Sequence, residues 1–134
     1  MYQQDYILRL IEQVGAVLRR MALRIAEGRA GEALEDSGEA LGLVLEMDPR
    51  FVESLSGASL VSLLGAGGRL DAKRALLLGQ VFARRAEARG AAGDADGATA
   101  ERDKAAALLT AVADLGDRED ARRADDLLGA PPFV

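Results

Sequence analysis

The side chains with the most distinctive spacing in this chain are arginines, and the chemistry open to them is the recognition of acidic groups. A guanidinium group stays charged at physiological pH and binds carboxylates through paired hydrogen bonds. One set of arginines recurs sixty-five positions later in the same order: Arg19, Arg20 and Arg24, then Arg84, Arg85 and Arg89. The pattern predicts a binding role.

Composition excludes most catalytic sites. The chain contains no histidine and no cysteine, which removes the commonest general base and the commonest transition-metal ligands. Hydrolytic triads, zinc-protease helices, di-iron carboxylate bundles and disulfide frameworks are therefore excluded. We expect no enzymatic activity and no cofactor. An enzyme that uses Asp or Glu together with Tyr6 or Arg9 is the alternative in this class.

One acidic loop is similar to a calcium-binding loop but lacks a ligand. If Gly97 takes the sharp-turn position of such a loop, Ala92 falls at the first ligand position, where an oxygen-bearing side chain is required. Asp94 is better explained as the N-cap of a helix. We therefore expect no bound metal.

The elements that carry the arginines are predicted to be helices joined in hairpins. Apolar residues repeat at helical spacing, and glycine, proline and aspartate mark the ends. We predict one all-α domain over residues 1–134. It comprises a hairpin at 5–48, a bridging segment of short helices at 49–70, a second hairpin at 71–115, a C-terminal helix at 117–128 and a tail at 129–134. The tail ends in Phe133 and Val134 after two prolines, and we expect it either to dock or to fray.

The first helix of each hairpin is predicted to carry a flank that binds a partner. In the first copy, the core stripe is Ile7, Ile11, Val14, Leu18, Met21 and Ile25, and the flank beside it is Tyr6, Leu10, Gln13, Val17, Arg20 and Arg24. In the second copy, the flank is Asp71, Ala75, Leu78, Phe82, Arg85 and Arg89. Each flank is apolar in the middle and cationic at one end. We predict a groove that binds a partner segment through Tyr6, Leu10, Val17, Arg20, Arg24, Leu78, Phe82, Arg85 and Arg89.

A second interpretation of the same arginines is that they pair with acidic residues of the neighbouring helices. Their aliphatic parts would then cover apolar surface, as charged helix flanks commonly do. The acidic residues available are Glu32, Glu35, Asp36, Glu39, Glu101 and Asp103.

Glycine and alanine at mid-helix positions form another candidate surface. Gly38 and Gly42 lie one turn apart, and Gly79 and Ala83 form a similar stripe. Glycine inside a helix costs about 1 kcal/mol relative to alanine, so a compensating contact is expected. Either two helices of one chain pack closely at these residues, or the residues form the seam of a homodimer.

Two resemblances bear on the fold. Glu27-Gly28 followed by Glu32-Ala33-Leu34, Gly93-Asp94 followed by Gly97-Ala98, and residues 45–49 resemble parts of tetratricopeptide repeats, although the copies lie sixty-five residues apart instead of about 34. The opening of the chain resembles a family of small bacterial proteins of unknown function through Gln3, Gln4, Asp5, Tyr6, Arg9, Ile11, Glu12 and Gln13. These resemblances imply antiparallel helical hairpins like those of tetratricopeptide repeats, and no catalytic residues.

We therefore expect a non-enzymatic interaction or scaffold module that binds a protein or peptide in a helical groove. The alternative is a structural subunit that self-associates into a homo-oligomer such as a homodimer. A net charge of −5 opposes binding to phosphate backbones, so a nucleic-acid partner is not expected. The opening residues do not fit a secretory signal, and no stretch approaches the length of a membrane span. We expect a cytoplasmic protein that does not bind membranes.

Overall fold

The computed structural model describes residues 2–115 and 118–134. These residues form helices and turns with no strand among them, which confirms the all-α prediction. The helices are α1 (Tyr2–Ala26), α2 (Ala30–Leu45), α3 (Pro49–Ser54), α4 (Gly57–Leu64), α5 (Ala72–Ala91), α6 (Ala95–Ala113) and α7 (Arg118–Leu128). Position 117, where we predicted the start of the last helix, lies outside the described residues.

Two long helices end at glycines whose backbone is left-handed. Gly28 after α1 has a φ of 77° and Gly93 after α5 has a φ of 82°, a conformation that is unfavourable for residues with a side chain. The residue after each glycine donates its backbone N–H to the carbonyl oxygen five residues earlier, at 2.7 Å in the first turn and 2.9 Å in the second. The two turns thus share one geometry at positions sixty-five residues apart.

Side-chain caps begin the next helices. Asp48, Ser56, Asp71 and Asp94 each accept a hydrogen bond from a backbone N–H in the first turn of α3, α4, α5 and α6, respectively. Such bonds satisfy donors that have no partner inside the helix. The cap predicted at Asp94 is confirmed.

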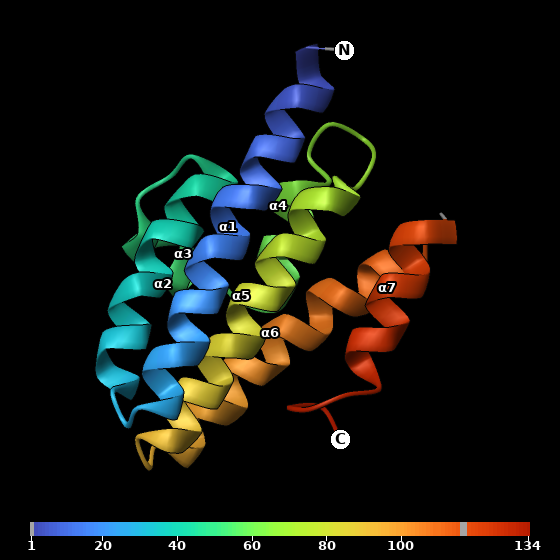
Figure 1. Cartoon of the computed structure of the whole chain (residues 1–134). Coiled ribbons are helices and arrows are strands. Elements are labelled where there is room, and N and C mark those ends of the chain that lie inside the picture. Colours follow the sequence, from blue (N-terminus) through green and yellow to red (C-terminus); the bar gives the residue numbers. More distant parts are fainter. Residues whose placement is uncertain (1, 116–117) are drawn as a thin grey trace.

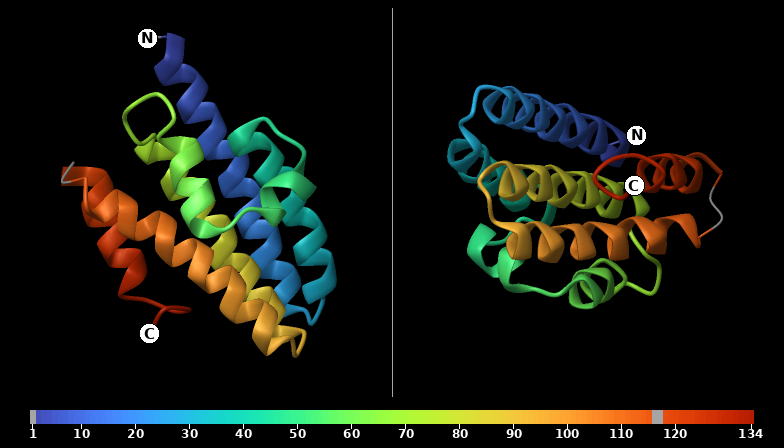
Figure 2. Two further views of the ribbon diagram at one scale, coloured as in Figure 1. Left: turned by 180° about the vertical axis from the view of Figure 1, so that it is seen from behind. Right: turned by 90° about the horizontal axis from the view of Figure 1, so that it is seen from below.

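The central helix is α5, which packs against α1, α2, α4, α6 and α7. In Figure 1, α1 and α2 run in opposite directions, as do α5 and α6, whereas α1, α5 and α7 all run the same way. The short helices α3 and α4 pack on α2 and α6, respectively, on the side of the molecule away from α1 (Figure 2). The bridging segment therefore lies mainly on α2 and α6, and α4 also makes a smaller contact with α5.

The side of α1 that is buried differs from the predicted one. Val14 and Met21 are fully buried as expected, but the other deeply buried residues are Leu10 and Val17 from the predicted flank, and Ile11 is 37% exposed. The remaining members of the predicted core stripe are only half-buried: Ile7, Leu18 and Ile25. Because α1 contacts both α2 and α5, its buried side is centred between those two helices.

Candidate binding groove

The apolar residues of the predicted binding flank lie mostly in the interior. Leu10, Val17, Leu78 and Phe82 are at most 3% exposed and belong to the hydrophobic core. Their positions are covered because α2 and α5 pack on α1, and α5 is itself surrounded. Val17, Leu78 and Phe82 line none of the grooves described below, and Leu10 reaches only the edge of a cleft, which corrects their predicted placement.

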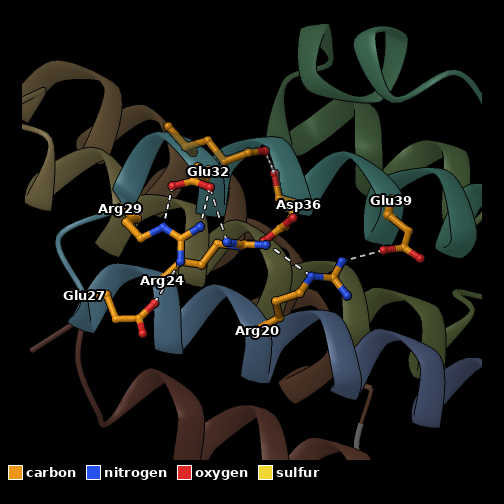
Figure 3. A network of polar contacts seen from close by, with 9 residues as sticks. Arg20, Arg24, Glu27, Arg29, Glu32, Asp36 and Glu39 are labelled. Atoms are coloured by element: carbon orange, nitrogen blue, oxygen red, sulfur yellow. Dashed lines mark hydrogen bonds and ion pairs between the residues drawn. The ribbon is translucent and has the colours of Figure 1, made fainter.

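The arginines of the first copy bind carboxylates of α2. Arg24 donates from Nε to Asp36 at 2.5 Å, and Arg20 donates from Nη2 to Glu39 at 2.6 Å. Arg24 also lies 3.4 Å from Glu32, and Figure 3 shows these contacts joining α1 to α2. The hydrogen bond to Glu39 raises the pKa of Arg20. The pairing interpretation is confirmed for both arginines.

The same network continues into the turn between α1 and α2. Arg29 donates from Nε to Glu32 at 2.5 Å and lies 3.2 Å from Glu27 (Figure 3). The hydrogen bond from Arg29 lowers the pKa of Glu32. In the turn of the first hairpin, Arg29 is therefore paired with two carboxylates.

Arg85 makes the corresponding contact in a buried setting. Its side chain is 3% exposed and donates from Nε to Glu101, whose side chain is 7% exposed. Its Nη1 donates to the Ser37 hydroxyl at 2.6 Å and to Glu53 at 3.2 Å. Arg85 thus connects α5 to α6, α2 and α3, and the pairing interpretation is confirmed for this residue as well.

Each hairpin holds its two helices with an arginine–carboxylate pair at an equivalent position. Arg20 lies 3.4 Å from Asp36, and a shift of sixty-five residues places this pair on Arg85 and Glu101. Arg89 differs, because it lies 3.6 Å from Asp94 and its buried Nε has no hydrogen-bond partner among the described atoms. The predicted arginines are therefore engaged mainly within the chain.

Tyr6 lines a small cleft between α1 and α2. The cleft has a volume of about 300 Å³ and is lined by Tyr6, Arg9, Leu10, Gln13, Gly42, Leu43 and Glu46. The Tyr6 hydroxyl donates to Glu46 at 3.0 Å, and the Arg74 guanidinium lies 5.4 Å from the centre of the Tyr6 ring. The hydrogen bond to Glu46 raises the pKa of Tyr6 above its ordinary value of 10.0. The structure thus brings three predicted residues, Tyr6, Leu10 and Gly42, to one cleft.

A second groove lies between α1 and α7, with α5 as its floor. Its volume is about 130 Å³, and its walls are formed by Leu18, Gln80, Ala83, Arg84, Glu87, Arg123, Leu127 and Pro131. We call it the α1/α5/α7 groove. Arg84 and Glu87 pair with each other at 2.7 Å on its floor. The Lys73 ammonium group lies 2.8 Å from Asp120, which links α5 to α7.

A wider and shallower apolar depression lies on the opposite side of the molecule. It has a volume of about 460 Å³ and is lined by residues of α3, of α4 and of the turn between them: Phe51, Leu55, Ala58, Ser59, Ser62 and Leu63. Phe51 is 51% exposed. No charged side chain lines this depression, so it offers little to fix the orientation of a ligand.

The predicted glycines differ in how closely neighbouring residues pack against them. A Cβ atom added to Gly79 would lie 2.9 Å from Leu109 of α6, so close packing of α5 on α6 requires a glycine there. At Gly38 and Gly42 the nearest atoms belong to Pro49, at 3.9 Å and 3.5 Å, which leaves ordinary room for a methyl group. Close helix packing is therefore confirmed at Gly79 only. Ala83 lies on the floor of the α1/α5/α7 groove.

The sequence predicted Ala83 as a helix-packing or dimer-seam residue and gave no prediction of this groove or of most residues that line it. The sequence pattern places Leu18 in the core stripe and does not distinguish Gln80, Arg123 or Leu127 as site residues. One signal was available: the sixty-five-residue shift places Leu18 on Ala83 and Arg19 on Arg84, and Leu18, Ala83 and Arg84 all line the groove. The contribution of α7 has no such signal, because α7 has no counterpart in the repeat.

Two further findings hold for residues 2–115 and 118–134. None of the helices there has the length and apolar composition required to cross a bilayer, and no three acidic side chains gather as ligands of a metal ion. Comparison with known proteins found no matching family model, curated protein or solved structure.

Proposed function

We propose that the protein is a non-enzymatic interaction module that binds a partner segment in the α1/α5/α7 groove. The observation that carries this proposal is the alignment of three helices in one direction around a groove whose lining is partly apolar. Leu18, Ala83 and Leu127 come from three different helices and are each half-buried against the core. Partly exposed apolar side chains on several helices are typical of peptide-binding grooves.

The hairpins are proposed to stack as tetratricopeptide repeats do. In this arrangement the first helix of the second hairpin packs on both helices of the first, as α5 packs on α1 and α2. The shared geometry of the turns at Gly28 and Gly93 supports the idea. In this view α7, which packs on α5 and α6, takes the place of the first helix of a third unit. Repeats stacked in this way bind ligands on the surface formed by their first helices.

The charges in the groove favour a partner that combines apolar and acidic groups. Arg84 is neutralised by Glu87, whereas Arg123 of α7 is an exposed cation at the groove wall. A segment with apolar side chains against Leu18 and Leu127 could place a carboxylate beside Arg123, where a charge-assisted hydrogen bond would fix its register.

The proposal is tested by placing a charge on the groove floor. Ala83→Glu adds a carboxylate where a partner's apolar side chain would lie, and burial of that charge should weaken binding at least about tenfold. The measurement is quantitative mass spectrometry of proteins captured from a lysate of the native host. Ala58→Glu, at an exposed position in the depression on the opposite side, is the matched control. Equal capture by wild type, Ala83→Glu and Ala58→Glu, with all three folded by circular dichroism, would remove the groove from consideration.

Self-association is a second candidate, favoured by exposed leucines on α1. Leu8 is 57% and Leu23 is 59% exposed, and both are apolar groups that a second chain could cover. Light scattering of the wild type and of Leu8→Glu/Leu23→Glu at high concentration separates this candidate from the first. A wild type that is strictly monomeric would exclude it.

A further inference from the structure

The C-terminal tail turns back onto the molecule after α7. Pro131 forms part of the wall of the α1/α5/α7 groove, and Phe133 is half-buried against the hydrophobic core. The next residue, Val134, is 80% exposed. Figures 1 and 2 show that the tail runs from the end of α7 back toward the other helices. The tail therefore docks on the molecule, with Pro131 at the groove and Phe133 against the hydrophobic core.

Packing of side chains is what holds the tail in place. The backbone hydrogen bonds of the described tail residues are all local: Gly129 donates to Asp125, Ala130 to Leu127 and Phe133 to Ala130. Residues 129–134 also contain no charged side chain. A contact of this kind, made by one aromatic and one proline side chain, can be exchanged for another apolar segment without leaving a buried polar group unsatisfied.

We infer that residues 129–134 are a displaceable plug of the α1/α5/α7 groove, with Phe133 as the anchoring side chain. This inference rests on the function proposed for the groove and adds its regulation. A tail attached to α7 is present at a high effective concentration, so it competes with any partner segment in the same chain. A partner binds only when its contacts exceed those of the tail, and the docked tail lowers the apparent affinity for partners.

The position of the tail in solution can be measured with a single tryptophan, because the chain contains none. In full-length Phe133→Trp, we expect blue-shifted emission and quenching by acrylamide several-fold weaker than in full-length Val134→Trp. Val134 is the matched control because it is the exposed neighbour of the anchor. Identical emission and quenching of the two variants, with both folded by circular dichroism, would overturn the inference.

Displacement is measured with a peptide of the tail itself. A labelled peptide Ala-Pro-Pro-Phe-Val, added to full-length protein, should bind Phe133→Ala about tenfold more tightly than wild type if the tail is docked about nine-tenths of the time. The same peptide should shift the emission of Phe133→Trp toward that of Val134→Trp, whereas a peptide with Phe replaced by Ser should not. Equal affinity for wild type and Phe133→Ala, or no binding to either, would contradict a displaceable plug.

Dilution shows whether the docked tail belongs to the same chain or to a second copy of the chain. The emission of Phe133→Trp should not change on dilution if the tail docks in its own chain, and a red shift on dilution would contradict the inference. None of these measurements uses a partner protein, so they fail or succeed independently of the lysate experiment with Ala83→Glu.

Discussion

At the scale of single residues, burial separates two ion pairs that occupy equivalent positions. Arg20 and Glu39 lie at the surface with side chains 40% and 57% exposed, and the other partner, Asp36, is 17% exposed. Arg85 and Glu101 are enclosed because α2 and α3 add Ser37 and Glu53 around the guanidinium group. Solvent screens the first pair, whereas the second has only its protein partners to stabilise its charges.

The buried pair should therefore be much more sensitive to mutation than the exposed one. Arg85→Leu leaves the Glu101 carboxylate in the interior without its guanidinium partner, and we expect a loss of about 3–5 kcal/mol in the free energy of unfolding. Arg20→Leu, the matched control from the first hairpin, should cost at most about 1 kcal/mol. Urea denaturation followed by circular dichroism measures both.

The double variant Arg85→Leu/Glu101→Leu tests the cause of that loss. Replacing both charges with apolar groups removes the uncompensated carboxylate, so most of the stability should return. A double variant as unstable as Arg85→Leu would mean that the loss arises from packing or from Ser37 and Glu53.

A second prediction at this scale concerns the ionisation of Tyr6. Because its hydrogen bond to Glu46 favours the protonated phenol, Glu46→Gln should lower the Tyr6 pKa toward 10.0. The raised pKa means that the Tyr6–Glu46 contact contributes its full stability below pH 10.0 and loses it as the pH rises through the pKa of the folded protein. Titration of the tyrosine ring signals by NMR, with Tyr6→Phe to assign them, provides the measurement. An unchanged pKa in Glu46→Gln would contradict the stated cause.

At the scale of the elements, replacing a helical glycine with alanine should have opposite effects on the free energy of unfolding at two positions. Gly79→Ala places a Cβ atom 2.9 Å from Leu109, and we expect overpacking between α5 and α6 to outweigh the gain in helix propensity, for a net loss of about 1–2 kcal/mol. Gly38→Ala meets its nearest neighbour at 3.9 Å and should gain up to about 1 kcal/mol. The midpoints of urea denaturation of the two variants are compared with that of the wild type. Equal shifts of both midpoints in the same direction would contradict the prediction that Gly79→Ala destabilises and Gly38→Ala stabilises the protein.

The helices themselves were largely predictable, because their signals are local. Capping aspartates such as Asp94, the turn glycines Gly28 and Gly93, and the periodicity of apolar residues depend only on neighbours in the sequence. The face that each helix buries was less predictable. In α1, Ile11 was predicted to be buried and Leu10 to lie on the binding flank, whereas Leu10 is buried and Ile11 is 37% exposed. A long helix with apolar residues on much of its circumference can bury more than one side, and the contacts of α1 with α2 and α5 decide which side is buried.

At the scale of the molecule, α5 joins parts of the chain that are distant in sequence. Its contacts with α1, α2, α4, α6 and α7 predict that both hairpins unfold together. Leu78→Ala, at a fully buried position of α5, should cost about 2–5 kcal/mol and keep a single unfolding transition. Amide hydrogen exchange in α1 and α6 should accelerate to the same extent. Two separate transitions, or acceleration in α6 alone, would show that the hairpins are independent.

The groove could not be predicted from the sequence, because it belongs to no single element. Leu18, Ala83 and Leu127 are unremarkable residues of three helices, and they become neighbours only when α7 packs beside α5. The docking of the tail was left open for the same reason, since Phe133 has no local signal that distinguishes a docked residue from a frayed one. Arg85 was recognised by its spacing, but its burial depends on α2 and α3.

The two ends of the helical stack also differ in polarity. The outer side of α7 presents the charged side chains Glu119, Arg122 and Asp126, whereas the outer side of α1 presents Leu8 and Leu23. A helical protein with apolar surfaces on two opposite sides can join end to end into filaments. If two chains met through Leu8 and Leu23 of α1, the outer side of α7 in each chain would still present charged side chains, which disfavour a further apolar contact there.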